Sequence, residues 1–313
     1  MLESRLLARI EEKKGRLDAL RPLPPAAVAR LNDQLTVEWI YNSNAIEGNT
    51  LSLQETRQIL ETGLTVGGKS LREHFEVTNH REAIRYVEAL VDGTEPVTAF
   101  QVRQVHGLVL AGIDDDSAGR YRVLPVRIAG SAHVPPEAWL VGQRMDDWQT
   151  WLMGEAKALH PVARAAEAHH RLVAIHPFLD GNGRTARLVM NLLLLQEGYP
   201  PAIILRVNRR QYYRVLARSD GGNVAPLVNF VGRAVERGLT LYLEACTPQT
   251  GPTPPGDEWI PLAQAAQGTP YSQDYLSLLA RRGRLEALKL GRNWHTSRRA
   301  VEAYRRSVEA SAS

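Results

Sequence analysis

Cysteine is nearly absent from this chain of 313 residues. Cys246 stands alone, so no disulfide can form within the chain, and such usage is typical of a reducing compartment. Long apolar runs are lacking too: the longest, LVMNLLLL at 188–195, is too short to cross a bilayer and is interrupted by Asn191. The charged, amphipathic start MLESRLLARIEEKKGRL differs from a secretory signal. We therefore expect a cytoplasmic protein that does not use a membrane.

Several signatures of catalysis are also missing. The chain has no Walker A loop, no protein-kinase signature and no G-x-S-x-G elbow. Its histidine-rich stretches, REHFEVTNH at 72–80 and AEAHHR at 166–171, do not match zinc-binding spacings such as H-E-x-x-H. We expect the histidines of both stretches to be structural. Asn191 must find a hydrogen-bond partner if it is buried.

Helical periodicity is what the chain has in quantity. Apolar spacing predicts helices over most of residues 1–245, and SLQET at 52–56 begins one of them, with Ser52 as N-cap and Glu55 completing a capping box. Residues 119–136, GRYRVLPVRIAGSAHVPP, differ because they are β-branched around a Gly-Ser centre, which predicts a short hairpin or an extended loop. The predicted fold class is therefore mainly α.

A change of composition indicates a second domain. TPQTGPTPPGDE at 247–258 contains four prolines and two glycines, which is typical of a linker. Beyond it the pattern predicts helix, turn, helix, short hairpin and helix. Residues 271–306 carry nine basic and three acidic side chains, a net charge of +6, so the rest of the chain carries −2 of the total of +4. Such a concentration of positive charge is expected where a protein contacts a phosphate backbone.

This basic module resembles a winged helix-turn-helix of the excisionase or MerR type. The resemblance implies DNA binding, with Ser272, Gln273 and Tyr275 as candidates on the recognition helix and Arg292 in the wing. A basic helix-turn-helix can also bind protein, so both kinds of partner stay open.

The densest group of reactive side chains lies at 176–187, HPFLDGNGRTAR. DGNG could form a hairpin turn, but the residues after it are helix formers without strand alternation, which puts the glycines at the start of a helix. Free N–H groups and the helix dipole favour an anion there, and Gly181 and Gly183 allow the backbone to form a nest. Arg184 and Arg187 share one face of the first turn, which indicates a polyphosphate.

Two further residues of this stretch could act on a bound polyphosphate. Asp180 is an oxygen ligand placed where it could hold Mg²⁺ between phosphates. His176 precedes it by four residues and is a candidate general base. The spacing resembles the core motif of Fic (Fido-fold) proteins, H-x-F-x-[DE]-G-N-G-R-x-x-R, at every specified position. The resemblance extends over roughly residues 35–245.

This resemblance implies a protein adenylyltransferase, which moves AMP from ATP to a Ser, Thr or Tyr hydroxyl of a protein and releases pyrophosphate. His176 would take the hydroxyl proton, and Asp180 would hold Mg²⁺. Arg184 would contact the leaving pyrophosphate, and Arg187 the γ-phosphate. The nucleotide-binding residues of the motif would be Asp180, Gly181, Asn182, Gly183, Arg184, Thr185 and Arg187.

The resemblance also assigns residues outside the motif. Residues 119–136 match the family's flap, which clamps a target peptide by adding a strand. Adjacent tyrosines are usually half-buried packing residues, but one such pair matches an aromatic pair near the adenine pocket. The residues implied to line the nucleotide are Ser131, Ala132, His133, Tyr212 and Tyr213.

A second motif, SNAIEGN at 43–49, lies far upstream. Gly48 predicts a helix end, and Glu47 would sit in the last turn, where the dipole disfavours an anion. Glu47 is therefore either an exposed carboxylate or one held by a cation elsewhere. The stretch resembles the family's inhibitory helix, [ST]-x-x-x-E-[GN], through Ser43, Glu47 and Gly48. The resemblance implies that Glu47 pairs with Arg187 in the place of the γ-phosphate, so that the α-phosphate is not aligned for attack.

Together these patterns predict a Fic/Fido helical core with a β-hairpin flap and a small C-terminal winged helix-turn-helix. The expected parts are an N-terminal helical region at 1–110 with an inhibitory helix at about 35–48, a catalytic core at 111–246, a linker at 247–258 and a terminal domain at 259–313. We expect an adenylyltransferase, restrained by Glu47, that uses ATP and Mg²⁺ and modifies a protein substrate including itself. Homodimerisation stays open. The alternatives are a DNA-binding regulator whose core senses nucleotide, a transferase with another donor such as UMP or phosphocholine, a kinase, and a de-AMPylase.

Overall fold

The computed structural model describes residues 2–91, 96–247, 259–281, 285–290 and 293–310. Contacts divide the chain into two compact units, Met1–Thr247 and Pro248–Ser313, which are described separately as unit 1 and unit 2. The predicted linker falls largely on 248–258, outside the described residues, and the four-part division of the chain stays a prediction. None of the described helices is long and apolar enough to cross a membrane.

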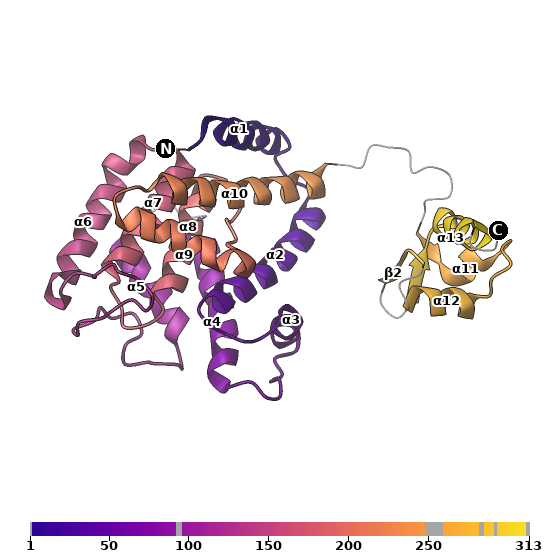
Figure 1. The fold of residues 1–313 in the computed structure, drawn as a ribbon, viewed down its shortest axis with the longest axis horizontal. Helices are drawn as coiled ribbons and strands as arrows, with labels where there is room; N and C mark the ends of the chain where they lie inside the picture. Colours follow the sequence, from indigo (N-terminus) through magenta and orange to yellow (C-terminus); the bar gives the residue numbers. More distant parts are fainter. Residues whose placement is uncertain (1, 92–95, 248–258, 282–284, 291–292, 311–313) are drawn as a thin grey trace. The chain divides into compact units, whose positions relative to one another are not determined.

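Unit 1 is built from helices and loops, as the helical periodicity predicted (Figure 1). Its helices are α1 (Ser4–Ala19), α2 (Pro25–Ile46), α3 (Leu53–Thr62), α4 (Leu71–Val91), α5 (Ala99–Leu110), α6 (Val141–Met153), α7 (Pro161–Ile175), α8 (Asn182–Gln196), α9 (Arg209–Asp220) and α10 (Ala225–Cys246). Short 3₁₀ turns lie at Ala138–Leu140, Glu155–Ala158 and Arg206–Asn208. The expected inhibitory helix is not separate, because it is the C-terminal half of α2.

Local sequence signals explain where several helices begin and end. The Ser52 hydroxyl accepts a hydrogen bond from the Glu55 N–H at 3.2 Å, and the Glu55 carboxylate accepts one from the Ser52 N–H at 2.7 Å, which confirms the predicted capping box of α3. Gly63 ends this helix with φ of 70°, in the left-handed region where glycine carries no steric cost. Proline supplies the first residue of both α2 and α7.

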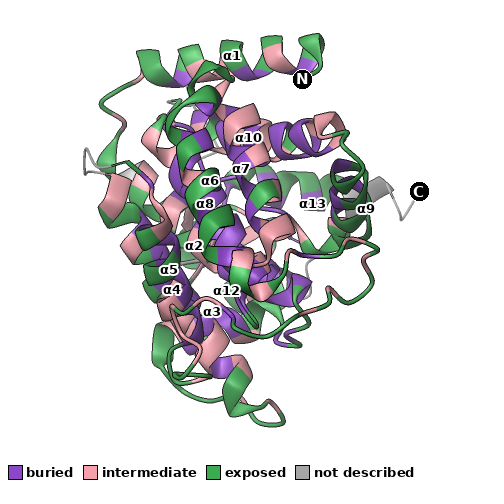
Figure 2. Cartoon of the chain, turned by 90° about the vertical axis from the view of Figure 1, so that its left-hand side faces the viewer, coloured by how far each residue is buried: buried purple, intermediate pink, exposed green. Residues whose placement is uncertain are grey.

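The core of unit 1 is centred on α8, almost all of whose residues are buried (Figure 2). It packs against α7, α4 and α5, and the side chains around it form one hydrophobic cluster that extends from α1 to α10. Asn191 lies fully buried in this helix, and its side-chain carbonyl accepts a hydrogen bond from the Ala202 N–H at 2.8 Å. The predicted partner of this amide oxygen is therefore a backbone group, which stabilises the loop after α8.

Residues 119–136 do not form the expected β-hairpin, since no strand is assigned anywhere in this stretch. The segment is an extended loop, with a turn closed by a hydrogen bond from the Ser131 N–H to the Ile128 carbonyl at 3.1 Å. Its two ends are joined because Arg122 donates to the Pro136 carbonyl. The β-branched residues are thus extended without a partner strand. Several apolar side chains of this segment are solvent-exposed, including Val123, Leu124 and Val134.

Unit 2 contains β1 (Ile260–Pro261), α11 (Leu262–Ala266), α12 (Gln273–Arg281), β2 (Ala287–Leu290), β3 (Asn293–Thr296) and α13 (Arg298–Ala310). The strands pair antiparallel in the order β1-β3-β2. A small core of its own includes Leu276, Leu279 and Val301. The element order is the predicted helix, turn, helix, hairpin and helix, while the assignment as a winged helix-turn-helix stays a prediction. Ser272, Gln273 and Tyr275 are exposed at the start of α12, and Arg292 lies outside the described residues.

The histidines of unit 1 predict a pH-dependent stability. Burial lowers the pKa of His106 to about 4 and that of His169 to about 3, and it also lowers the pKa of His80. Because an unfolded chain protonates these groups below about pH 6.5, the unfolded state then binds more protons than the folded one. The free energy of unfolding should fall with pH from about 6.5 downwards, by up to about 1.4 kcal/mol per pH unit for each histidine.

Urea denaturation at pH 7.5, 6.5 and 5.5 would measure this decline. His169→Gln removes one titrating group, so the variant should lose stability less steeply between pH 6.5 and 5.5 than the unchanged protein. Equal slopes for the two proteins would contradict the assignment of His169 as a buried neutral base.

Candidate active site

The HPFLDGNGRTAR stretch forms the turn between α7 and α8. His176 ends α7 with φ of 50° and ψ of 59°, and no other described residue except glycine has a positive φ. A left-handed conformation costs a residue with a Cβ about 1 kcal/mol, and such strain is concentrated at functional sites. Gly181, with φ of 74°, caps the N-terminus of α8. The nest predicted from the two glycines therefore lies at a true helix start.

Asn182 and His106 hold this turn in shape. The Asn182 carboxamide accepts from the Phe178 N–H at 3.0 Å and donates to the Phe178 carbonyl at 2.9 Å. The Phe178 ring is fully buried and stacks on the His106 ring, with centroids 3.6 Å apart. The Asn182 side chain thus shapes the loop in this arrangement, and the predicted phosphate contact of this residue stays a prediction.

The ring nitrogens of His106 have defined roles. Nδ1 accepts a hydrogen bond from the Gly119 N–H at 2.9 Å, so Nε2 carries the proton and donates to the Asp180 carbonyl at 3.0 Å. This tautomer agrees with the lowered pKa of the ring. A Cβ added at Gly181 would lie 3.3 Å from the His106 ring. This close packing is a reason for glycine at 181 in addition to its positive φ. His106 therefore fixes the backbone on which the Asp180 side chain is carried.

His176 has the properties of a general base. Its Nδ1 lies 3.3 Å from the Val173 carbonyl and donates to it, which leaves Nε2 as the nitrogen able to accept a proton. Burial lowers the pKa of His176 below its ordinary value, opposed by the Val173 hydrogen bond and by Glu47. The imidazole is therefore neutral at pH 7, which a base requires.

The end of α2 reaches the other side of this turn and contacts Arg187. Glu47 Oε1 lies 2.7 Å from Arg187 Nη1, the Ser43 hydroxyl accepts from Nε at 3.0 Å, and the Ser43 carbonyl accepts from Nη2 at 2.9 Å. The Arg187 side chain is 3% exposed and that of Glu47 is 32% exposed. Burial opposes the charge of Arg187, but Glu47 and Tyr212 outweigh it and raise its pKa. The expected ion pair is therefore present, and Glu47 is held by a cation rather than exposed alone.

The Glu47 carboxylate also lies against the first turn of α8. A Cβ added at Gly183 would collide with Glu47 Oε1 and would come within 3.1 Å of Arg187 Nη1. An anion is therefore already paired with the Arg187 guanidinium beside the first turn of α8, where the helix dipole favours negative charge. A side chain at position 183 would therefore displace the Glu47 carboxylate from its present place.

Behind Arg187 lie two buried aromatic side chains, Tyr212 and His169. The Tyr212 hydroxyl and His169 Nε2 are hydrogen-bonded at 2.8 Å, and the Arg187 guanidinium lies 6.0 Å from the centroid of the Tyr212 ring. Tyr212 is only 1% exposed, whereas Tyr213 is half-exposed and its ring faces the Arg209 guanidinium at 4.8 Å. The predicted adenine contacts of these two tyrosines stay predictions. In this structure Tyr212 supports Arg187 from within the core.

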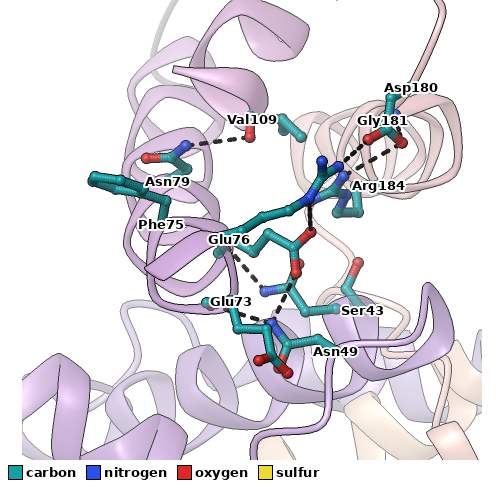
Figure 3. A network of polar contacts seen from close by, with 12 residues as sticks. Ser43, Asn49, Glu73, Phe75, Glu76, Asn79, Val109, Asp180, Gly181 and Arg184 are labelled. Carbon is teal, nitrogen blue, oxygen red and sulfur yellow. Dashed lines mark hydrogen bonds and ion pairs between the residues drawn. The ribbon is translucent and has the colours of Figure 1, made fainter. Parts of the chain in front are cut away.

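Arg184 points to the opposite side, towards α4 (Figure 3). Its Nη1 lies 3.3 Å from Glu76 Oε1, and its Nη2 lies 3.7 Å from Asp180 Oδ1. Arg72 donates to the other carboxylate oxygen of Asp180. Burial opposes ionisation of Asp180, but Arg184, the Gly181 N–H and Arg72 lower its pKa, so its carboxylate is charged.

The donor set around Asp180 fits a magnesium ion held with a nucleotide. The described residues contain no group of three or more His, Cys, Asp or Glu able to form an all-protein metal cage. Mg²⁺ does not need one, because it is usually bound by one or two carboxylates together with phosphates and water. The Asp180 side chain is 48% exposed, so a cation can reach it.

The flap is fastened to the turn by Arg122. Its N–H donates to the Pro177 carbonyl at 2.9 Å, its Nε donates to the His176 carbonyl at 2.8 Å, and its Nη1 donates to the Leu124 carbonyl at 3.0 Å. His133 adds a bond from Nε2 to the Ala174 carbonyl at 2.9 Å. Ser131 accepts from the His133 N–H, Ala132 is exposed, and Thr185 is fully buried. The nucleotide contacts of these three residues stay predictions.

Four residues of this site were not singled out from the sequence: Arg72, Glu76, His106 and Arg122. Their contacts with the turn span 54 to 108 positions of the chain, and none belongs to a local motif. The only available signal was a polar residue on an otherwise apolar helix face, such as His106 in AFQVRQVHGLVL. That signal does not distinguish a functional residue from an ordinary core histidine.

Arg122 yields a prediction about the flap. Arg122→Ala removes three side-chain hydrogen bonds to backbone carbonyls, so the flap should open more often. Amide hydrogen exchange over residues 119–136 should become at least about tenfold faster, the equivalent of one or two net hydrogen bonds. Arg127→Ala, in an exposed arginine of the same segment, is the control and should leave exchange unchanged. Equal exchange in both variants would contradict an anchoring role for Arg122.

Comparisons with known proteins agree with this geometry. A family model described as "Fic/DOC family" matches residues 96–194, which contain the whole turn. "Protein adenylyltransferase Fic" of Nematostella vectensis is 40% identical over 248 residues, covering 79% of this chain and 57% of that protein. The chain spans about half the length of the curated relatives it matches.

Two solved structures extend the comparison. A Fic domain containing signaling protein from Bacteroides thetaiotaomicron is 31% identical with a TM-score of 0.71, and the alignment covers 76% of this chain and 96% of that one. A Fic family protein from Desulfovibrio desulfuricans is 26% identical with a TM-score of 0.63 and covers 94% of both chains. The mainly helical fold is thus shared, and the chain belongs to the Fic family.

Proposed function

We propose that this protein transfers AMP from ATP to a hydroxyl side chain of a protein, and that Glu47 restrains the reaction. The observation that carries the proposal is the ion pair between Glu47 and the buried Arg187 guanidinium, which lies beside the first turn of α8. The names of the curated relatives support AMP as the transferred group.

His176 would act on the incoming hydroxyl. Its neutral Nε2 takes the proton as the hydroxyl oxygen attacks the α-phosphorus. The new bond joins that oxygen to phosphorus, and the bond from the α-phosphorus to the bridging oxygen of pyrophosphate breaks. Pyrophosphate leaves with the electron pair, and His176 keeps the proton until solvent or product removes it.

The remaining groups of the turn would bind and orient the phosphates. The N–H groups at Gly181 and Gly183 and the dipole of α8 favour the negative oxygens. Arg184 would contact the β-phosphate, and Arg187 the γ-phosphate. Mg²⁺, held by Asp180 and by the phosphates, would neutralise charge that develops on the leaving group.

The restraint follows from competition for Arg187. A buried guanidinium left without an anion would cost several kcal/mol, so Arg187 is stable with Glu47 or with a phosphate, but not alone. Glu47 is the more exposed partner of the pair, so an incoming phosphate would replace Glu47 rather than displace Arg187. While Glu47 stays in place, the γ-phosphate is excluded, and a displacement of about 1 Å at the reacting atoms can cost about a hundredfold in rate.

The DNA contact predicted for unit 2 remains a separate proposal. It is supported by the clustered charge and by the exposure of Arg281 and Arg298 at the ends of α12 and α13. Donors other than ATP stay an alternative that the following experiment tests, and homodimerisation and removal of AMP stay predictions.

Removing Glu47 should activate the protein. After incubation of Glu47→Gly with Mg²⁺ and ATP, intact-mass spectrometry should detect self-modification as adducts of about 329 Da, the mass of AMP less water, formed at least about tenfold faster than in the unchanged protein. UTP in place of ATP tests donor choice, because it would give a lighter adduct.

Two variants control this experiment. Glu47→Gly/His176→Ala should form no adduct, because the base is missing. Asp33→Asn, in an exposed acid of the same helix, should behave as the unchanged protein. A Glu47→Gly protein no more active than the unchanged one would overturn the restraint, and equal activity without His176 would overturn the assigned base.

The lowered pKa of His176 predicts the pH dependence. Because burial favours the neutral imidazole, the rate of self-modification by Glu47→Gly should fall to half its maximum only below pH 6.5. Loss of the Glu47 charge lowers this pKa further, since that carboxylate favours the imidazolium. Initial rates between pH 5 and pH 8 would measure the acid limb, and a half-maximal rate at or above pH 6.5 would contradict this role.

A further inference from the structure

Arg184 is held from one side by a residue that the mechanism above does not use. Its side chain is 3% exposed, and its guanidinium lies between Glu76 on α4 and Asp180 on the turn (Figure 3). The Nε and Nη1 atoms make no hydrogen bond to any described residue. Arg184 is therefore placed by charge, and its Nε and Nη1 atoms are buried.

Glu76 contacts both the motif and the inhibitory end of α2. Its Oε1 is 3.3 Å from Arg184 Nη1, and its Oε2 accepts from the Asn49 side-chain N–H at 2.8 Å. Its backbone carbonyl accepts from the Asn44 side chain at 3.1 Å. The carboxylate is 12% exposed and lies 3.5 Å from Arg72 Nε. The Glu76 side chain thus contacts both Asn49, which follows Glu47 in the chain, and Arg184.

The chemistry of the contacts requires a carboxylate. Both oxygens of Glu76 face donors, Asn49 on one side and Arg184 with Arg72 on the other. An amide has only one acceptor oxygen, so a glutamine at this position would have to turn its NH₂ group towards a donor. A change of a single atom would therefore break one of the two contacts without altering the size of the side chain.

Glu76 also balances Asp180. The two carboxylates lie on opposite sides of the Arg184 guanidinium, and Glu76 is nearer, at 3.3 Å against 3.7 Å. Without the charge of Glu76, a nearly buried cation would keep Asp180 as its main partner. The Arg184 guanidinium would then move towards Asp180, the carboxylate proposed to hold Mg²⁺, and away from the position in which it faces the β-phosphate.

We propose that Glu76 is the positioning residue of Arg184, which holds this guanidinium off Asp180 and ready for the β-phosphate of the nucleotide. The inference rests on the proposed nucleotide chemistry and adds a residue to it. Through Asn49, the same carboxylate links the placement of Arg184 to the chain that follows Glu47.

Glu73 provides a matched control, because it ties down the same chain segment without contacting Arg184. Its carboxylate accepts from the Thr50 N–H at 2.8 Å, from the Thr50 hydroxyl at 2.7 Å and from the Ser70 N–H at 3.0 Å. The hydrogen bonds from Thr50 and Ser70 lower its pKa to about 2. Glu73→Gln therefore weakens the anchoring of residues 49–50 as Glu76→Gln does, but leaves the surroundings of Arg184 intact.

The experiment uses the full chain with Glu47→Gly, in which the inhibitory carboxylate is absent, and compares it with Glu47→Gly/Glu76→Gln and Glu47→Gly/Glu73→Gln. Calorimetry measures the affinity of each protein for ADP and for AMP in the presence of Mg²⁺. AMP lacks the β-phosphate that Arg184 would contact. Thermal unfolding of each protein checks that it is folded at the temperature of the titration.

Glu76→Gln should weaken ADP binding about tenfold, a loss usual when a residue that orients a ligand-binding side chain is removed, and should leave AMP binding within about twofold. Glu73→Gln should leave both affinities unchanged. Undiminished ADP binding in Glu76→Gln, an equal loss for ADP and AMP, or the same loss in Glu73→Gln would each overturn the inference. Failure of Glu47→Gly itself to bind ADP or AMP would instead count against the proposed function.

Discussion

The site depends on one buried cation, Arg187. Its guanidinium is enclosed by the core, and every nearby group serves either to keep it charged or to supply an anion. Tyr212 and His169 support it from behind, while Ser43 and Glu47 reach it from α2. A charge that is nearly excluded from water must have a partner. The rest of the site therefore determines whether Glu47 or a phosphate pairs with Arg187.

The arrangement of helices makes that choice sensitive to position. Three helices meet at the turn: α7 ends at it with His176, α8 begins at it with Gly181, and α2 ends against it with Glu47. The proposed base, the N–H groups proposed to bind phosphate and the proposed competing carboxylate are therefore all carried at helix ends. The long side chains of Arg184 and Arg187 span the distances between these helix ends. Glu76 on α4 contacts the Arg184 guanidinium.

The sequence predicted the parts of the site that follow local rules. Two of these parts each lie within a short stretch of the chain, namely the motif from His176 to Arg187 and the capping box of Ser52. The ion pair of Glu47 with Arg187 was expected through a family resemblance, which Ser43 and Glu47 match. His106 could not be predicted, because its bonds to Asp180 and Gly119 depend on how α5 packs on α8. The flap was predicted as a hairpin from its β-branched residues, but Arg122 draws its backbone to the turn, and no second strand pairs with it.

The covalent link between Glu47 and the rest of the site has a quantitative consequence. An anion carried by the same chain meets Arg187 at an effective concentration that dilution of the protein does not change. If only a fraction of molecules has Arg187 free, the apparent affinity for a phosphate ligand is reduced by that fraction. In the proposed restraint, Glu47 therefore sets a threshold on nucleotide concentration that is the same at any level of expression.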